Sequence, residues 1–291
     1  MYDYIIAADN MGDLPDDYCE KHDLKRVFLS ILMDGVTYDA DNRIDDHEFY
    51  DTMRAGSMPV TSQIAPEKAK NAFLEYLKEK KKIIFFTVSS GISGTYSSVY
   101  TAAQEVMEEE KDCQIAVVDS LCASLGEGLL IHKALKMREG GASFEEVVEW
   151  VESHKKNVVY MFTVNDLFHL HRGGRVSKAT AIVGSLVNIK PVLHVDDEGR
   201  LINISKVRGR KKSLIALADA VASKQGSWAQ ENIDDCMMIS HGDCPEEARW
   251  LAEHVKERYG IREVLISYVG ATIGAHTGPG VVAFFFMGDE R

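Results

Sequence analysis

The stretch Ile83-Ile84-Phe85-Phe86-Thr87-Val88-Ser89-Ser90-Gly91-Ile92-Ser93-Gly94-Thr95 decides how this chain folds. Its apolar and β-branched first half predicts a buried strand, and the serines and glycines after it predict a tight loop. The residues from Tyr96 to Glu110 have the pattern of a helix. Free N–H groups in the first turn of that helix, and the positive end of its dipole, would face the loop. The stretch therefore predicts a site for a carboxylate or a phosphate.

The rest of the chain repeats this alternation of strand and helix. Ser143 and Glu146 form a capping box, Pro66 and Pro245 suit first helical turns, and Gly260 suits a helix end. The alternation indicates an α/β fold with mainly parallel sheets. The expected strands are Tyr4–Ala8, Val27–Met33, Ile83–Val88, Ile115–Val118, Val158–Thr163, Pro191–Val195, Leu201–Ser205, Met237–Ser240, Val264–Val269 and Val281–Met287.

The second half of the chain departs from this simple alternation. Asp196-Asp197-Glu198-Gly199 lies between two expected strands and is typical of a hairpin turn, which requires antiparallel neighbours. We therefore expect a mixed sheet in the second half. The 291 residues suffice for two domains, and we place the first at residues 1–160 and the second at residues 161–291.

Composition argues against several classes of function. The chain has 33 basic and 45 acidic residues and a net charge of −12, which disfavours nucleic-acid binding. Its five cysteines show no Cys-x-x-Cys pairing, so we expect free thiols in a cytoplasmic protein. The longest apolar run, Val281–Met287, is far too short to cross a bilayer. His169 and His171 diverge on an expected helix and lack further ligands, so we expect no metal and no cofactor.

Four side chains are candidates for contact with an anion. Ser93 is either a hydroxyl donor to a ligand or an N-cap of the following helix. Thr61 and Ser62 precede an expected helix, where turn formation and capping explain them most simply. His276 lies in the glycine-rich segment Gly270–Gly280, which we expect to be a loop that something approaches closely.

Two basic segments lie in the second half, Arg172-Gly173-Gly174-Arg175 and Lys206–Lys212. Each is either a solvated face or a site for phosphate or an acidic partner. A separate alternative is a serine hydrolase that uses Ser93 and His276, because Ser93 lies at a strand–turn–helix corner. Thr95 stands where a nucleophile elbow has glycine, which counts against that alternative. A third alternative, a component of a sugar- or dihydroxyacetone-phosphate transferase, rests on fold analogy alone.

Several segments together resemble the DegV family in order and spacing, and the resemblance covers essentially the whole chain. Each motif is short, but their combination in register is specific. The matching segments are Thr61-Ser62-Gln63, Ser89-Ser90-Gly91-Ile92-Ser93-Gly94-Thr95, Arg172-Gly173-Gly174-Arg175-Val176-Ser177, Asn188-Ile189-Lys190-Pro191 and Ile273-Gly274-Ala275-His276-Thr277-Gly278-Pro279-Gly280.

The resemblance implies a two-domain α/β fold that binds one long-chain fatty acid. The acyl tail would lie in the N-terminal domain, with the carboxylate near the domain interface. The protein would not be an enzyme by itself. It would present the fatty acid to a separate ATP-binding subunit of a bacterial fatty acid kinase, which makes the acyl-phosphate for phospholipid synthesis. The ligand-binding residues implied are Thr61, Ser62, Ser93, Gly94 and His276.

The resemblance also implies that Arg172 and Arg175 lie near the head group and meet the phosphate or the kinase subunit. Physical reasoning agrees with a lipid ligand. A buried carboxylate without donors costs several kcal/mol, and hydroxyl groups at a helix start supply them. Each buried methylene contributes about 0.8 kcal/mol, so the tail would provide most of the affinity.

Overall fold

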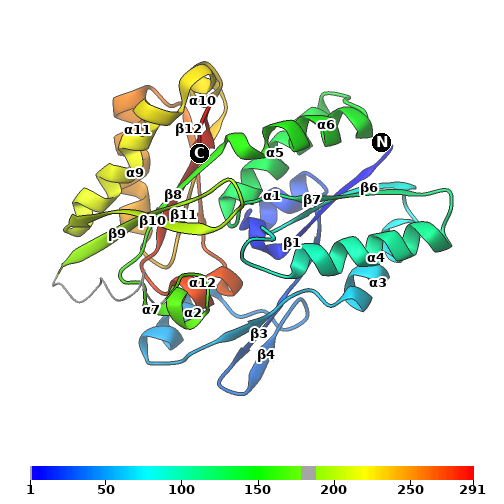
Figure 1. Ribbon diagram of the computed structural model, residues 1–291, viewed down its shortest axis with the longest axis horizontal. Helices are drawn as coiled ribbons and strands as arrows, with labels where there is room; N and C mark the ends of the chain where they lie inside the picture. Colours follow the sequence, from blue (N-terminus) through cyan, green and yellow to red (C-terminus); the bar gives the residue numbers. More distant parts are fainter. Residues whose placement is uncertain (1, 178–187) are drawn as a thin grey trace.

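The structure is a computed structural model that describes residues 2–177 and 188–291. Its described strands form three sheets with the orders β2-β1-β6-β7, β10-β9-β8-β13-β11-β12 and β4-β3-β5 (Figure 1). The strands are β1 (Ile5–Asp9), β2 (Lys25–Val27), β3 (Ser30–Met33), β4 (Val36–Tyr38), β5 (Val60–Ser62), β6 (Lys82–Thr87), β7 (Gln114–Asp119), β8 (Val158–Thr163), β9 (Ile189–Val195), β10 (Leu201–Arg208), β11 (Cys236–His241), β12 (Glu263–Tyr268) and β13 (Val282–Met287).

The helices lie mainly between consecutive strands of the two larger sheets. They are α1 (Asp16–Lys21), α2 (Asp46–Arg54), α3 (Pro66–Tyr76), α4 (Thr95–Glu109), α5 (Leu125–Glu139), α6 (Phe144–His154), α7 (Phe168–Arg172), α9 (Arg210–Lys224), α10 (Ala229–Asp234), α11 (Pro245–Tyr259) and α12 (Ala271–Thr277). The Ser143–Glu146 capping box opens α6, and Gly260 ends α11 in the left-handed conformation. Each described helix falls short of the length and apolarity needed to cross a membrane.

The two larger sheets differ in strand direction. Every pairing in the four-stranded sheet is parallel. In the six-stranded sheet only β11 and β12 pair in parallel, and its other neighbours are antiparallel. This confirms the expected α/β fold, with a parallel sheet in the first half and a mixed sheet in the second. The second sheet begins in sequence at Val158, close to the boundary expected at residue 160, and the division into domains stays a prediction.

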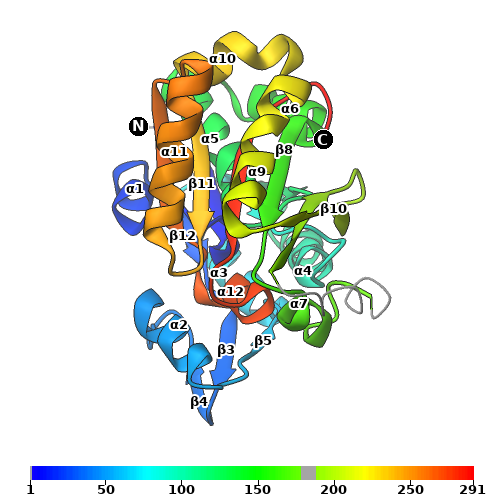
Figure 2. The same cartoon turned by 90° about the vertical axis from the view of Figure 1, so that its left-hand side faces the viewer.

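Helix α5 lies between the two larger sheets. It contacts β1 and β6 of the first sheet and β8, β11 and β13 of the second. Its buried residues surround the helix instead of forming one stripe, as expected for a helix packed on several sides. One continuous core therefore joins the two halves of the chain. A second core lies on the opposite face of the six-stranded sheet, under α9 and α11 (Figure 2).

The expected strand Val27–Met33 is wrong, because the structure divides it between two sheets. β2 pairs in parallel with β1, whereas β3 pairs antiparallel with β4 and β5. The chain changes direction between them, where the Leu29 N–H donates to Asn10 Oδ1 at 2.7 Å. A continuous apolar run carries no signal for such a change of sheet.

The segment Gly270–Gly280 is not the loop expected, because it contains α12. Gly274 lies inside this helix, and a Cβ there would lie 2.6 Å from Tyr50 Oη and 2.8 Å from the Phe49 ring. The glycine therefore allows α2 to pack closely against α12. Gly278, with φ of +76°, ends the helix.

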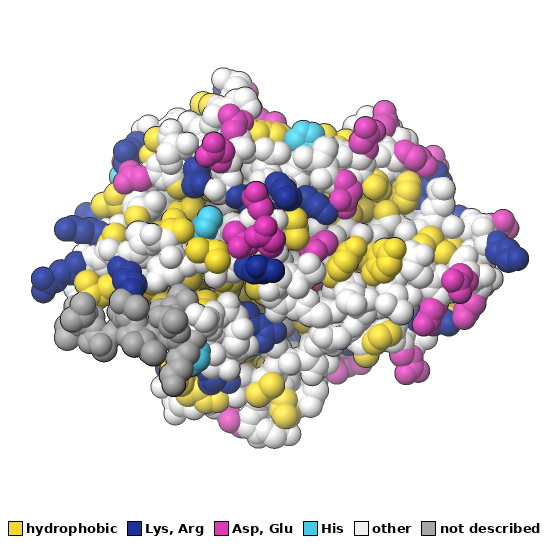
Figure 3. Space-filling view, viewed as in Figure 1, with side chains coloured by type: hydrophobic (Ala, Val, Ile, Leu, Met, Phe, Trp, Pro, Cys, Tyr) yellow, Lys and Arg dark blue, Asp and Glu magenta, His cyan; other side chains and the backbone are white. Residues whose placement is uncertain are grey.

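The basic run Lys206–Lys212 also belongs to regular structure. It completes β10 and begins α9, and Arg210 pairs with Glu247 at 2.6 Å. Lysine and arginine side chains gather at the left of Figure 3, on the side where β9 and β10 lie in Figure 1. Part of this run is thus a solvated basic face on an acidic protein.

Candidate functional site

A cavity of about 170 Å³ lies where β5, α12 and the Ser89–Thr95 loop meet. It brings together all five residues expected to bind a ligand. The polar lining includes Thr61, Ser62, Gln63, Ser93, Gly94, Arg175, Thr272, His276 and Thr277. The apolar and aromatic lining includes Met11, Leu29, Ile92, Ala123, Tyr160, Phe162, Leu170, Leu201 and Ile273.

Thr61 and His276 form the central polar contact of this cavity. Thr61 Oγ1 lies 2.8 Å from His276 Nε2, which joins β5 to α12 across 215 positions of sequence. Burial, together with the positive charges of Arg175 and Arg172, lowers the pKa of His276 to about 4. The imidazole is therefore neutral near pH 7 and can donate one hydrogen bond. Thr61 lies on a strand, so the expectation that it serves a turn or a cap is wrong.

The Ser89–Thr95 loop is held from three directions. The Val88 N–H donates to Asp9 Oδ2 at 2.8 Å, and the Ser90 N–H donates to Asp119 Oδ1 at 3.0 Å. Ser89 Oγ donates to the Gly199 carbonyl, which belongs to the hairpin between β9 and β10, at 2.9 Å. Both larger sheets therefore hold the loop in place.

Ser93 lies at the start of α4 without occupying the N-cap position, which belongs to Gly94. Its Oγ lies 3.0 Å from Thr95 Oγ1 and accepts the Thr95 N–H at 3.2 Å. Gln63 fills the space next to Gly94 and donates to Ser98 Oγ at 2.7 Å. The hydroxyl of Ser93 therefore lies in the cavity lining at the positive end of a 15-residue helix.

Arg172 and Arg175 make different contacts. Arg172 donates to the Pro59 carbonyl from both terminal nitrogens at 3.1 Å and to the Ala275 carbonyl at 2.8 Å. Its guanidinium thus ties α7 to the chain before β5 and to α12. Arg175 lines the cavity, and its Nε donates to the Ile92 carbonyl at 3.0 Å.

The apolar residues that line the cavity were not identified from the sequence, although some of them lie in a recognisable sequence pattern. Along β8, Tyr160 and Phe162 belong to the core around α5, whereas Val159 and Met161 belong to the core under α9 and α11. This alternation is visible in the sequence as a buried strand. Which of its faces borders a cavity depends on what packs against the strand.

A model of the DegV family, described as a family of uncharacterised proteins, matches residues 4–289. The chain belongs to the DegV family. A DegV domain-containing protein of Clostridium perfringens is 39% identical over 293 residues, which cover 100% of this chain and 99% of the relative. A fatty acid-binding protein of Thermotoga maritima is 33% identical, with 96% of each chain covered. The solved structure of a fatty-acid-binding DegV family protein from Thermus thermophilus is 30% identical, has a TM-score of 0.86, and is matched over 99% of this chain and 100% of its own.

The site of this DegV family member does not assemble a nucleophile with a base. Ser93 Oγ is engaged with Thr95, and His276 Nε2 is engaged with Thr61. Within the described residues, His276 Nδ1 is buried without a hydrogen-bond partner, so no carboxylate orients the ring. A serine hydrolase requires both contacts. The hydrolase alternative therefore has no support in this geometry.

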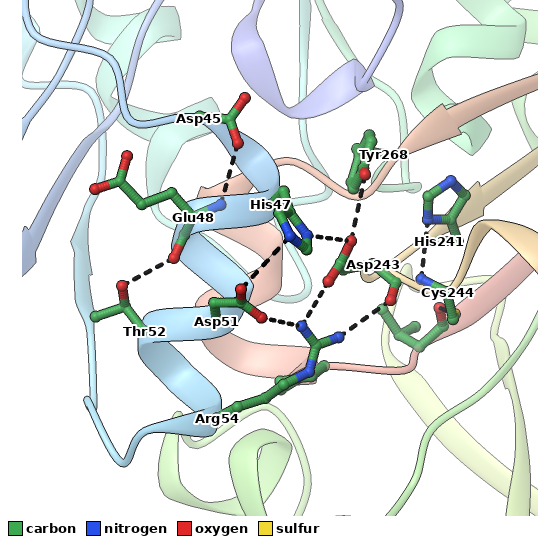
Figure 4. A network of polar contacts seen from close by, with 12 residues as sticks. Asp45, His47, Glu48, Asp51, Thr52, Arg54, His241, Asp243, Cys244 and Tyr268 are labelled. Carbon is green, nitrogen blue, oxygen red and sulfur yellow. Dashed lines mark hydrogen bonds and ion pairs between the residues drawn. The ribbon is translucent and has the colours of Figure 1, made fainter.

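A second polar cluster joins α2 to the loop after β11 (Figure 4). His47, Asp51 and Asp243 offer ligand atoms within 4.8 Å of one another. Arg54 already bridges the carboxylates, with Nη1 2.7 Å from Asp51 Oδ1 and 2.5 Å from Asp243 Oδ2. Since a positive charge occupies the cluster, we interpret it as an ion-pair network that holds α2 against the second sheet.

Protonation of His47 is expected to strengthen this network. Its pKa is raised by Asp243, Asp51 and Asp45, so the folded protein holds that proton more tightly than the unfolded chain. The stabilisation is present below the ordinary histidine pKa of 6.5 and is lost as the pH rises through the raised value. Raising the pH from about 6 to about 8 removes this stabilisation from the wild type but not from His47→Gln. Over that range, the melting temperature of the wild type should therefore fall relative to that of His47→Gln.

Thermal unfolding followed by circular dichroism at both pH values measures this difference. His254→Gln, on α11, removes an imidazole outside the network and serves as the control. Asp243 also contacts Arg54 and Tyr268, and neither of these residues is changed by the variant. An identical pH dependence in His47→Gln and the wild type would show that the network does not depend on this proton.

Proposed function

We propose that this protein binds a long-chain fatty acid, with the carboxylate at Thr61, Ser93 and His276. The observation that carries the proposal is one cavity that combines the Thr61 hydroxyl, and the Ser93 hydroxyl at the start of α4, with apolar and aromatic lining residues. Relatives that match this chain over nearly their whole length are described as fatty-acid-binding proteins. Both lines of support point to the same class of ligand.

The polar lining suits an anion. A carboxylate buried without partners costs several kcal/mol, and the hydroxyls of Thr61 and Ser93 can each donate one hydrogen bond. When the proton is on Nε2, the neutral imidazole of His276 donates to Thr61 Oγ1 and leaves the Thr61 hydroxyl proton for the carboxylate. The positive end of α4 and the guanidinium of Arg175 add favourable electrostatics without a full ion pair.

We propose that the acyl tail lies between the two larger sheets. The apolar lining of the cavity comes from both halves of the chain. Met11 and Leu29 belong to the first half, and Tyr160 and Phe162 belong to the second. This placement differs from a tail held by the N-terminal domain alone. Burial of about 0.8 kcal/mol per methylene would then provide most of the binding free energy.

The finer part of the proposal is that the bound carboxylate is presented to a separate ATP-binding kinase subunit, in the cytoplasm. It is supported by the resemblance and by the lack of a nucleophile–base pair in the site. Arg175 is our candidate for contact with the phosphate or the kinase, because it lines the cavity. Arg172 is already committed to two backbone carbonyls. The protein itself would need no cofactor.

Titration of delipidated protein with palmitate or stearate, followed by calorimetry, tests the proposal. We expect saturable binding with one site, and weaker binding of the methyl ester of the same chain, because the ester cannot carry the negative charge. Mass spectrometry of denatured, freshly purified protein should release a long-chain fatty acid. Incubation with fatty acid and ATP alone should yield no acyl-phosphate. A delipidated protein that does not bind either acid would refute the proposed function.

A further inference from the structure

Tyr160 is a buried tyrosine whose hydroxyl lacks a partner. Its side chain is only 4% exposed and lines the cavity. The hydroxyl of buried Tyr4 donates to the Ala142 carbonyl at 3.0 Å, and that of buried Tyr50 donates to the Val269 carbonyl at 2.6 Å. The structure gives the Tyr160 hydroxyl no such bond with any described residue. Unlike the Tyr259 hydroxyl, which is fully buried without a partner, the Tyr160 hydroxyl keeps some accessible area, so a ligand that fills the cavity would cover it.

The Tyr160 ring is fixed in place by other aromatic rings. Phe285 is its direct partner in the antiparallel pairing of β8 with β13, and the ring centroids lie 4.6 Å apart. Phe162 lies two residues along on the same face, with centroids 5.3 Å apart. Because the ring is packed on both sides, its hydroxyl is not free to turn toward a distant acceptor.

The Phe162 and Phe285 rings beside Tyr160 carry no hydrogen-bond acceptor, whereas the hydroxyls of the head-group region have partners. Thr61 contacts His276, and Ser93 contacts Thr95. Burial raises the pKa of Tyr160 well above its ordinary value, so the phenol stays protonated and remains a donor. A saturated acyl chain offers this donor no acceptor. An oxygen atom on the chain would offer one.

We propose that this cavity prefers fatty acids whose chain carries a hydroxyl or oxo oxygen within reach of Tyr160 over unsubstituted acids of the same length. The inference rests on the proposed function, because it concerns the tail of the same ligand. A substituent oxygen gives up its hydrogen bonds to water on binding, and the Tyr160 hydroxyl replaces one of them. An unsubstituted chain would cover the phenol without pairing it, which is the less favourable state.

Competition between stearic acid and a series of hydroxystearic acids, which differ only in the position of the hydroxyl, tests this preference. Dissociation constants are measured on delipidated wild-type protein and on Tyr160→Phe. For at least one positional isomer, we expect the ratio of the stearate constant to the hydroxystearate constant to fall by about three- to ten-fold in the variant. Tyr259→Phe is the matched control, because it removes a hydroxyl without a partner from α11, outside the cavity.

The two proposals fail in different ways. If stearate and every hydroxystearate bind the wild type, and the ratio is the same in Tyr160→Phe for all isomers, the chain-oxygen preference is wrong and the fatty-acid proposal stands. If no acid of either kind binds the wild type, both proposals are wrong. Melting temperatures of the two variants establish that each is folded, so a lost preference is not a lost fold.

Discussion

Delipidated protein that carries both Thr61→Val and Ser93→Ala is expected to bind stearate about 100-fold more weakly than the wild type. Each hydroxyl would donate to a charged carboxylate, and such bonds contribute about 1.5–3 kcal/mol, part of which water recovers in the variant. Either single variant should therefore lose about 1–2 kcal/mol. The tail still binds in all of them, so the affinity is reduced and not abolished.

Calorimetric titration with stearate and with its methyl ester measures the effect. The ester has no charge to lose, so its affinity should change much less than that of the acid. Ser90→Ala is the matched control, since Ser90 is an exposed serine of the same loop and lies outside the cavity lining. Equal affinity for stearate in the double variant and the wild type would place the carboxylate elsewhere.

The second large effect is expected from Arg172→Met, which should lower the free energy of unfolding by about 2–4 kcal/mol. The arginine donates to the Pro59 and Ala275 carbonyls, and its loss removes both of these hydrogen bonds. Methionine keeps the aliphatic stem, so the change acts mainly through the guanidinium. Because the same bonds tie β5 to α12, the Thr61–His276 contact should loosen as well, and fatty-acid affinity should fall.

Urea denaturation measures the stability of this variant. Arg249→Met on α11 is its control, because the side chain is exposed, does not line the cavity and forms no ion pair with a described residue. Unchanged stability and unchanged fatty-acid binding in Arg172→Met would contradict a structural role. Arg172 would then be available to meet the phosphate or the kinase subunit, as the family resemblance implies.

Local signals in the sequence were enough for much of the fold. The run from Ile83 to Thr95 predicts a strand, a loop and a helix, and all three are present as β6, the Ser89–Thr95 loop and α4. Such signals act over a few residues, through periodicity, glycine conformation and helix capping. They were misleading at Val27–Met33 and at Gly270–Gly280, where the direction of the chain and the packing of α2 against α12 decided the outcome.

The candidate residues Thr61, Ser93 and His276 could be named from sequence because their motifs resemble those of one family. Their arrangement in space could not be predicted from the sequence. Thr61 meets His276 across 215 positions only because the small sheet packs on α12, and Tyr160 faces the cavity only because α5 lies between two sheets. The sequence by itself determined most of the elements and the chemical types of the site residues. The tertiary structure decided the cavity, because its shape depends on how whole helices and sheets pack, and no short stretch of chain contains that information.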